Sequence, residues 1–108
     1  MNTLIEVIDR LDQVDDSDRF NPRIIFAEGE SSALPTARAL VCPGDEEGTR
    51  QCPLDSTLRE VLLVWLAKEA IQVWSFWRGG RLPNAEDKFE AVVYYSRNDA
   101  YLPVKRQV

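Results

Sequence analysis

The chain has 108 residues, 44% of them hydrophobic and 29% charged, which is the composition of one globular domain. Thirteen basic and eighteen acidic residues give a formal net charge of −5, which argues against nucleic acid as a ligand, because phosphate binding needs a clustered surplus of lysine and arginine. Histidine is absent, which removes Ser-His-Asp and Cys-His dyads and the usual zinc sites.

The first residues, MNTLIEVIDR, have neither the basic region nor the long apolar run of a secretory signal. The longest apolar stretch, Val61 to Ala67, is far shorter than the roughly 20 residues that span a bilayer. We therefore expect a cytoplasmic protein that does not enter a membrane. In that compartment Cys42 and Cys52 are expected to be thiols, whereas an oxidising compartment would allow a bridge between them.

The first predicted element is a helix from about Leu4 to Asp12. Thr3 and Glu6 have the spacing of a capping box, and apolar residues then recur at helical spacing. An acidic cluster follows the helix, and its short polar side chains favour an exposed loop because they compete for backbone hydrogen bonds. Its acids are Asp15, Asp16 and Asp18.

Two strands are predicted next, and we expect them to pair antiparallel with a wide connection. Arg23 to Ala27 is a short β-branched and aromatic run, and Thr36 to Cys42 is apolar although it contains alanine. The segment from Pro43 to Pro53 combines prolines, glycines and three consecutive acids, which predicts an exposed loop. These acids are Asp45, Glu46 and Glu47.

The segment from Ser56 to Trp77 is apolar on too many faces for one surface helix, and two solutions remain. One is a single long buried helix. The other is a short helix, a strand at about Val61 to Leu66, and a helix from about Ala67 to Trp77. We prefer the second, because VLLVWL is rich in β-branched and aromatic residues whereas KEAIQVWSFW has clearer helical periodicity. Trp65 and Trp74 are expected in the core.

Gly79 and Gly80 are expected to end that helix. Asn84 is a favourable N-cap for a last helix, which an apolar stripe extends to about Asn98. The pattern as a whole predicts a single α+β domain over residues 1–108, with a small antiparallel sheet packed against about three helices.

Carboxylate pairs are the one catalytic device left without histidine, since two acids can hydrolyse a glycoside. No spacing singles out an acid and a nucleophile, the acidic runs lack EF-hand spacing, and Gly79-Gly80 lacks a phosphate-loop context. We therefore predict no enzyme, no metal and no cofactor, with a carboxylate-dependent hydrolase as the alternative.

A protein partner is the remaining prediction. Acidic loops can steer and dock a basic partner, and Trp77 ends a helix beside Arg78, where a ring can stay partly exposed as an interface anchor. Solvated charge runs and an ordinary helix end are the alternative interpretation, and an oligomeric scaffold that buries its own aromatic patch is another. The predicted binding residues are Asp15, Asp16, Asp18, Asp45, Glu46, Glu47 and Trp77.

The C-terminal segment KFEAVVYYSRNDAYLPV resembles small bacterial domains whose last helix carries a pattern like AFxYYxxNDAF. It departs from the pattern at Val92, where an aromatic residue is expected; the matching residues are Ala91, Tyr94, Tyr95, Asn98, Asp99, Ala100 and Tyr101. In size, charge and missing catalytic groups, such proteins resemble the immunity proteins of contact-dependent growth inhibition and other polymorphic toxin systems. The resemblance implies binding and neutralisation of a toxin domain. From the residues alone, Tyr95 packs inward while Asn98 and Asp99 terminate the helix.

Overall fold

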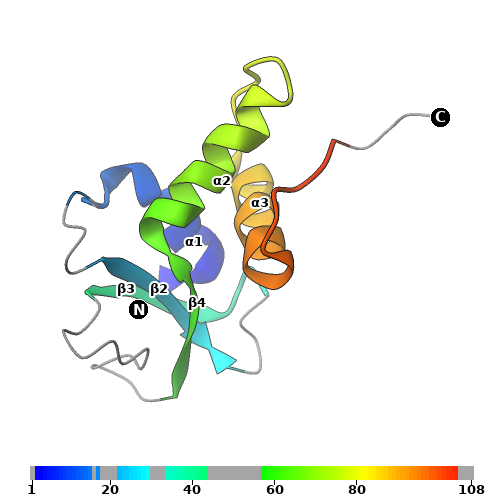
Figure 1. Cartoon of the computed structure of the whole chain (residues 1–108). Coiled ribbons are helices and arrows are strands. Elements are labelled where there is room, and N and C mark those ends of the chain that lie inside the picture. The colour runs from blue at the N-terminus through cyan, green and yellow to red at the C-terminus, as the bar shows by residue number, and fades with distance from the viewer. Residues whose placement is uncertain (1, 16, 18–21, 30–33, 44–56, 105–108) are drawn as a thin grey trace.

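Among the residues that the structure describes, four strands form one antiparallel sheet in the order β1-β3-β2-β4 (Figure 1). The computed structural model describes residues 2–15, 17, 22–29, 34–43 and 57–104. The central strands are β2 (Arg23–Glu28) and β3 (Arg38–Pro43), which pair antiparallel as predicted. Strand β4 (Leu58–Leu63) lies on the other side of β2, and β1 (Asn2–Thr3) adds a short edge beside β3. The predicted loop from Pro43 to Pro53 lies outside the described residues after its first position.

Strand β2 is buried on both faces, which explains its uninterrupted apolar sequence. Ile25 and Ala27 belong to the cluster that packs under the helices, and Ile24 and Phe26 belong to a second cluster on the opposite face. Cys42 of β3 is buried in that second cluster, and Cys52 lies outside the described residues.

A β-bulge in β4 changes which face of the sheet its side chains reach. Ile25 is opposite Leu62 and the next residue, Phe26, is opposite Glu60, so Val61 is an extra residue in β4. As a result Leu58 and Leu62 pack on opposite faces, although an even spacing in a regular strand would put them on the same face.

Helix α1 (Leu4–Asp9) is shorter than predicted, and a 3₁₀ turn, η1 (Leu11–Gln13), follows it. The helix ends because the Arg10 backbone leaves the helical region, with φ −102° and ψ 16°. The predicted capping box is present: Glu6 Oε1 accepts from Thr3 N at 3.3 Å and from Thr3 Oγ1 at 2.7 Å. These hydrogen bonds lower the pKa of Glu6. The 3₁₀ turn places Leu11 in the core.

Helix α2 (Val64–Phe76) follows β4 without an intervening loop. The preferred order of a strand followed by a helix is confirmed, but the strand both starts and ends three residues earlier than predicted, and Leu58 to Glu60, where the short preceding helix was expected, belong to the strand. The physical reason is packing: a helix that starts at Val64 aligns Val64, Ala67 and Trp74 on one buried stripe. Trp74 is in the core as predicted, whereas Trp65 is only partly buried.

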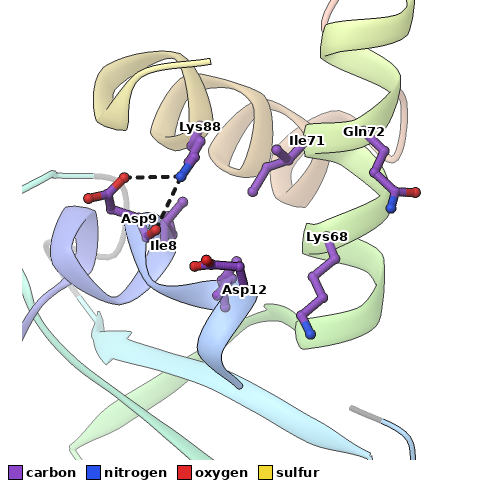
Figure 2. Close-up of a pocket in the computed structure, with 8 residues that line it drawn as sticks. Ile8, Asp9, Asp12, Lys68, Ile71, Gln72 and Lys88 are labelled. Atoms are coloured by element: carbon purple, nitrogen blue, oxygen red, sulfur yellow. Dashed lines mark hydrogen bonds and ion pairs between the residues drawn. The ribbon is translucent and has the colours of Figure 1, made fainter. Parts of the chain in front are cut away.

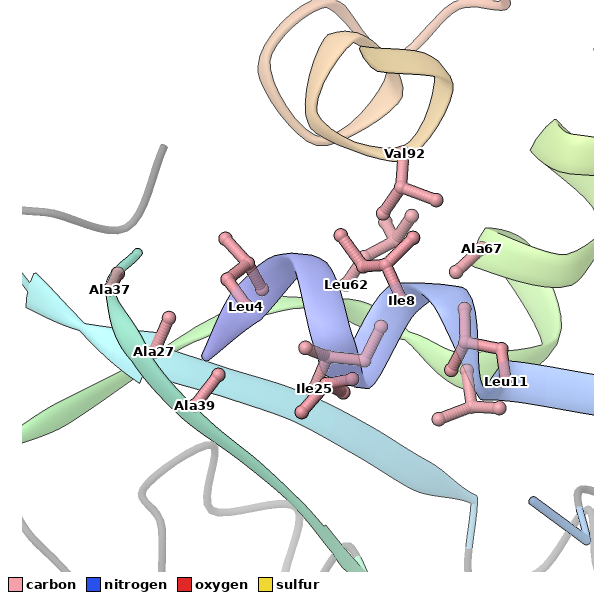
Figure 3. Packing of buried hydrophobic residues seen from close by; sticks show 12 residues of the cluster. Leu4, Ile8, Leu11, Ile25, Ala27, Ala37, Ala39, Leu62, Ala67 and Val92 are labelled. Atoms are coloured by element: carbon pink, nitrogen blue, oxygen red, sulfur yellow. The ribbon is translucent and has the colours of Figure 1, made fainter. Parts of the chain in front are cut away.

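Helix α3 (Ala85–Asn98) runs between the predicted N-cap and the predicted last residue. All three α-helices cover the same face of the sheet (Figure 1). Their apolar residues meet the sheet in one cluster, to which Ile8 of α1, Leu62 of β4 and Val92 of α3 all belong (Figure 3). The described part of the chain is thus an α+β fold with a four-stranded antiparallel sheet and three α-helices. No helix in this part is long and apolar enough to cross a membrane.

Candidate protein-binding surface

The structure places two of the seven predicted binding residues, Asp15 and Trp77. Asp15 is exposed, and its Oδ1 accepts a hydrogen bond from the Ser17 backbone at 2.9 Å. The hydrogen bonds from Ser17 lower the pKa of Asp15. Asp15 therefore closes a local turn while keeping its charge in solvent. The other five acids lie outside the described residues: Asp16, Asp18, Asp45, Glu46 and Glu47.

Trp77 lies at the end of α2, beside two apolar side chains that are more exposed than its own. Trp77 is 47% exposed, Phe76 80% and Leu82 88%. Figure 1 shows that α2 extends beyond α1 and the sheet, so this end of the α2–α3 pair projects from the body. We call residues 76–83, the last residue of α2 and most of the connection to α3, the tip. Exposed apolar side chains that gather in one place mark interaction sites more often than scattered ones do.

The backbone of the tip is held by a Schellman-type helix end. Gly80 N donates to Ser75 O at 2.9 Å, and Gly79 takes the left-handed conformation that this end requires, with φ +69°. Ser75 also binds the returning chain, because its Oγ donates to Arg81 O at 2.8 Å. The predicted end of the helix at the two glycines is confirmed, and the hydrogen bonds there hold the backbone of the tip in place.

Two arginines of the tip pack on Trp74, which is 5% exposed. The Arg78 guanidinium carbon lies 4.5 Å from the Trp74 ring centroid, and that of Arg81 lies 5.4 Å away. Arg78 Nη1 also donates to Trp74 O at 3.0 Å, and Arg81 Nη2 lies 3.7 Å from Asp87 Oδ2 of α3. These contacts join the tip to both helices and leave positive charge beside the exposed rings.

The N-terminus of α3 closes the other side of the tip. Asn84 Oδ1 accepts from Asp87 N at 2.8 Å, and Asp87 Oδ2 accepts from Asn84 N at 3.1 Å. This reciprocal pair is a capping box, which satisfies backbone donors that a helix start leaves open. Both ends of the tip are therefore anchored by hydrogen bonds.

The segment after α3 supports Trp77 from the side. Asp99 takes the left-handed conformation, with φ 52°, and ends α3 as predicted. The chain then returns so that the Tyr101 ring meets Trp77 edge-on at 5.8 Å and Tyr95 at 5.3 Å. Arg78 Nη2 donates to Pro103 O at 3.2 Å. Asp99 and Tyr101, two of the residues that match the C-terminal pattern, thus have a structural role, and Tyr95 packs inward against the cluster under the helices, as predicted.

A cavity of about 200 Å³ lies between α1, η1, α2 and α3 (Figure 2). Its apolar lining comes from Ile8, Leu11 and Ile71. Two lysines on its rim are held by α1 and by the residue after η1: Lys88 Nζ lies 3.2 Å from Asp9 Oδ1, and Lys68 Nζ donates to Val14 O at 2.6 Å. The remaining lining residues are Asp12 and Gln72.

Asp9 and Asp12 are the two carboxylates that line this cavity, and a carboxylate-dependent hydrolase needs such a pair. Both side chains are exposed, and Asp9 pairs with Lys88. Neither carboxylate has the apolar, desolvated surroundings that make such a group a general acid. Within the described ranges, no group of three or more Cys, Asp or Glu residues is placed to hold a metal ion.

Comparisons with protein-family models, curated proteins and solved structures found no match to this chain. The sequence interpretation included Trp77 among the candidate residues but not Phe76 and Leu82, which are more exposed. A signal for each existed. Phe76 falls off the buried stripe that contains Trp74, and Leu82 stands between a glycine pair and the Asn84 cap, where no helix can bury it.

Proposed function

We propose that this chain is a non-catalytic protein-binding domain and that the tip is its main contact surface. The observation that carries the proposal is the exposure of Phe76 and Leu82, at 80% and 88%, on a backbone held at both ends by hydrogen bonds. Large side chains on a rigid support are typical interface anchors, because little conformational entropy is lost when a partner covers them.

The chemistry of the tip defines the partner surface. Phe76, Trp77 and Leu82 need an apolar depression, and Arg81, whose side chain is 65% exposed, needs oxygen acceptors at the edge of that depression. A folded protein domain offers both, since a buried interface centre is apolar and its rim carries carbonyl and carboxylate groups.

We propose further that the partner is a bacterial toxin domain, neutralised in the cytoplasm. The resemblance of the segment from Ala91 to Tyr101 to immunity proteins supports this class. The net charge of −5 favours a basic partner, and exposed acids such as Asp15 would raise the association rate through steering. In this arrangement the contacts of the tip determine the affinity, and the acidic residues raise the association rate.

The proposal requires a toxin domain encoded beside this gene, and the test uses that purified domain. Calorimetric titration should give a dissociation constant on the order of nanomolar or lower for the wild type. Phe76→Gln and Leu82→Gln should each raise it at least about 30-fold, the loss typical of an interface hot spot. Leu34→Gln is the matched control, because Leu34 is 53% exposed in the turn before β3 and should leave the affinity unchanged.

Each arm of this experiment can fail separately. Wild-type protein that neither binds the neighbouring toxin nor protects cells against it would exclude the toxin as the partner. Tight binding that survives both glutamine substitutions would place the interface elsewhere on the surface. If the acidic residues steer the toxin, the association rate constant should decrease steeply as salt is added. A rate constant that does not depend on salt would exclude this steering role.

A further inference from the structure

The tip and the cavity lie on the same side of α2. Gln72 lines the cavity, and Phe76 lies one helical turn further along, so the two side chains lie on one face of the helix. One chain therefore presents a projecting apolar side chain and, beside it, an apolar hollow. Such a pair can be self-complementary between two copies.

The size of the cavity suits the side chain. Its volume is about 200 Å³, and its lining includes the aliphatic side chains of Ile8, Leu11 and Ile71. Apolar protein cavities of about 150 Å³ admit benzene, so a phenyl ring fits a hollow of this size. Phe76 is 80% exposed and is the most exposed aromatic side chain among the described residues.

The charges are complementary as well. On the cavity rim, Lys68 is bound to Val14, which follows η1, and Lys88 is bound to Asp9 of α1, whereas the Asp12 carboxylate makes no hydrogen bond or ion pair in the described part of the chain. Figure 2 shows Asp12 at the rim between η1 and α2. The tip carries the opposite charge, because the Arg81 side chain is 65% exposed beside the apolar residues. A tip seated in the cavity would bring these two charges together.

We propose that the free protein forms a two-fold symmetric dimer in which Phe76 of each copy enters the cavity of the other and Arg81 faces the other copy's Asp12. Phe76 and Lys68 are eight residues apart, about 12 Å along the helix, and Gln72 lies midway between them on the same face, so antiparallel α2 helices that cross near Gln72 place each Phe76 ring opposite Lys68 at the rim of the other copy's cavity. The inference rests on the tip being a binding surface, and it adds a regulation. Self-association and the protein partner compete for the same residues.

Light scattering coupled to gel filtration, together with sedimentation equilibrium over a concentration series, tests the dimer. The wild type should dimerise with a dissociation constant on the order of micromolar, as expected of a small interface. Phe76→Gln on the tip and Asp12→Arg on the rim should each raise that constant at least about tenfold. The double variant Asp12→Arg, Arg81→Asp should recover dimerisation, because the charge pair is restored with reversed signs, and Leu34→Gln should dimerise like the wild type.

A wild-type protein that stays monomeric up to about millimolar concentration would overturn the dimer. A dimer that persists in both single variants would overturn the assigned face. These results are independent of the proposed function: a monomeric wild type whose toxin binding is lost in Phe76→Gln removes the dimer alone. If the protein forms a tip-dependent dimer and its apparent affinity for the toxin is still the same at all protein concentrations, self-association and toxin binding do not compete.

Discussion

The Tyr101 hydroxyl donates a hydrogen bond to the Glu69 carboxylate, with 2.5 Å between the two oxygens, and so joins the segment after α3 to the middle of α2. The same ring contacts Trp77 and Tyr95. One side chain therefore connects the C-terminal segment, the helix that carries the tip, and the tip itself.

This contact predicts a stability change at high pH. The hydrogen bond with Glu69 is the main cause that raises the pKa of Tyr101 to about 12, and burial contributes as well. In the unfolded chain a tyrosine titrates near pH 10. The neutral phenol is thus favoured in the folded state, so its stabilisation is complete below about pH 10 and is lost as the pH rises to about 12. Urea unfolding at a series of pH values measures this loss.

Two variants check the assignment. Tyr101→Phe should remove the late step from a titration of tyrosinate absorbance, and Glu69→Gln should shift that step to lower pH, because the amide does not repel a tyrosinate. An unchanged titration in Tyr101→Phe would assign the raised pKa to another group.

Local rules of helix capping predicted the elements around the tip well. The Asn84 cap predicted the start of α3, and Gly79 and Gly80 predicted the end of α2, because both depend on backbone groups within a few residues. The boundary between β4 and α2 could not be predicted from local rules, because it depends on contacts across the sheet. The apolar run from Val61 to Leu66 suits a strand and a helix equally, and the last pair across the sheet, Leu63 with Ile24, marks where the strand ends.

The candidate site was only partly predictable for a related reason. An apolar residue in a helical segment is normally assigned to the core, and the exposure of Phe76 depends on how far α2 projects past its neighbours. That length is a property of the packed structure. The acids of the two loops stay a prediction where the structure does not describe them, and Asp15 is exposed as a steering charge must be.

The cap at the start of α3 yields a second prediction. Asn84→Ala removes the acceptor of the Asp87 N–H hydrogen bond and should lower the free energy of unfolding by about 1 kcal/mol. Denaturant titration measures this loss, which should appear as a lower midpoint with an unchanged m-value. Asn84→Ser is the control, because a serine hydroxyl also caps a helix and should recover most of the loss.

The packing under the helices yields a third prediction, which concerns stability. Ile8 is fully buried between α1, the sheet and α3, so Ile8→Ala should cost about 2–5 kcal/mol through lost apolar contact and the cavity left behind (Figure 3). Leu34→Ala removes a similar side chain from an exposed position and should change the stability by less than about 0.5 kcal/mol. Equal effects of the two substitutions would contradict the core assignment.

The fourth prediction concerns the rigidity on which the proposed function depends. A Cβ added at Gly79 would have no atom within 4 Å, so its cost comes from the φ of +69° alone. Gly79→Ala should therefore destabilise the protein by about 1–2 kcal/mol, and Gly79→Asn by less, because asparagine tolerates the left-handed conformation. Denaturant titration gives both values. Partner binding should weaken more in the alanine variant than in the asparagine variant, since the unfavourable backbone would disorder the tip before contact. Alanine and asparagine variants with equal stability would show that this glycine does not hold the helix end.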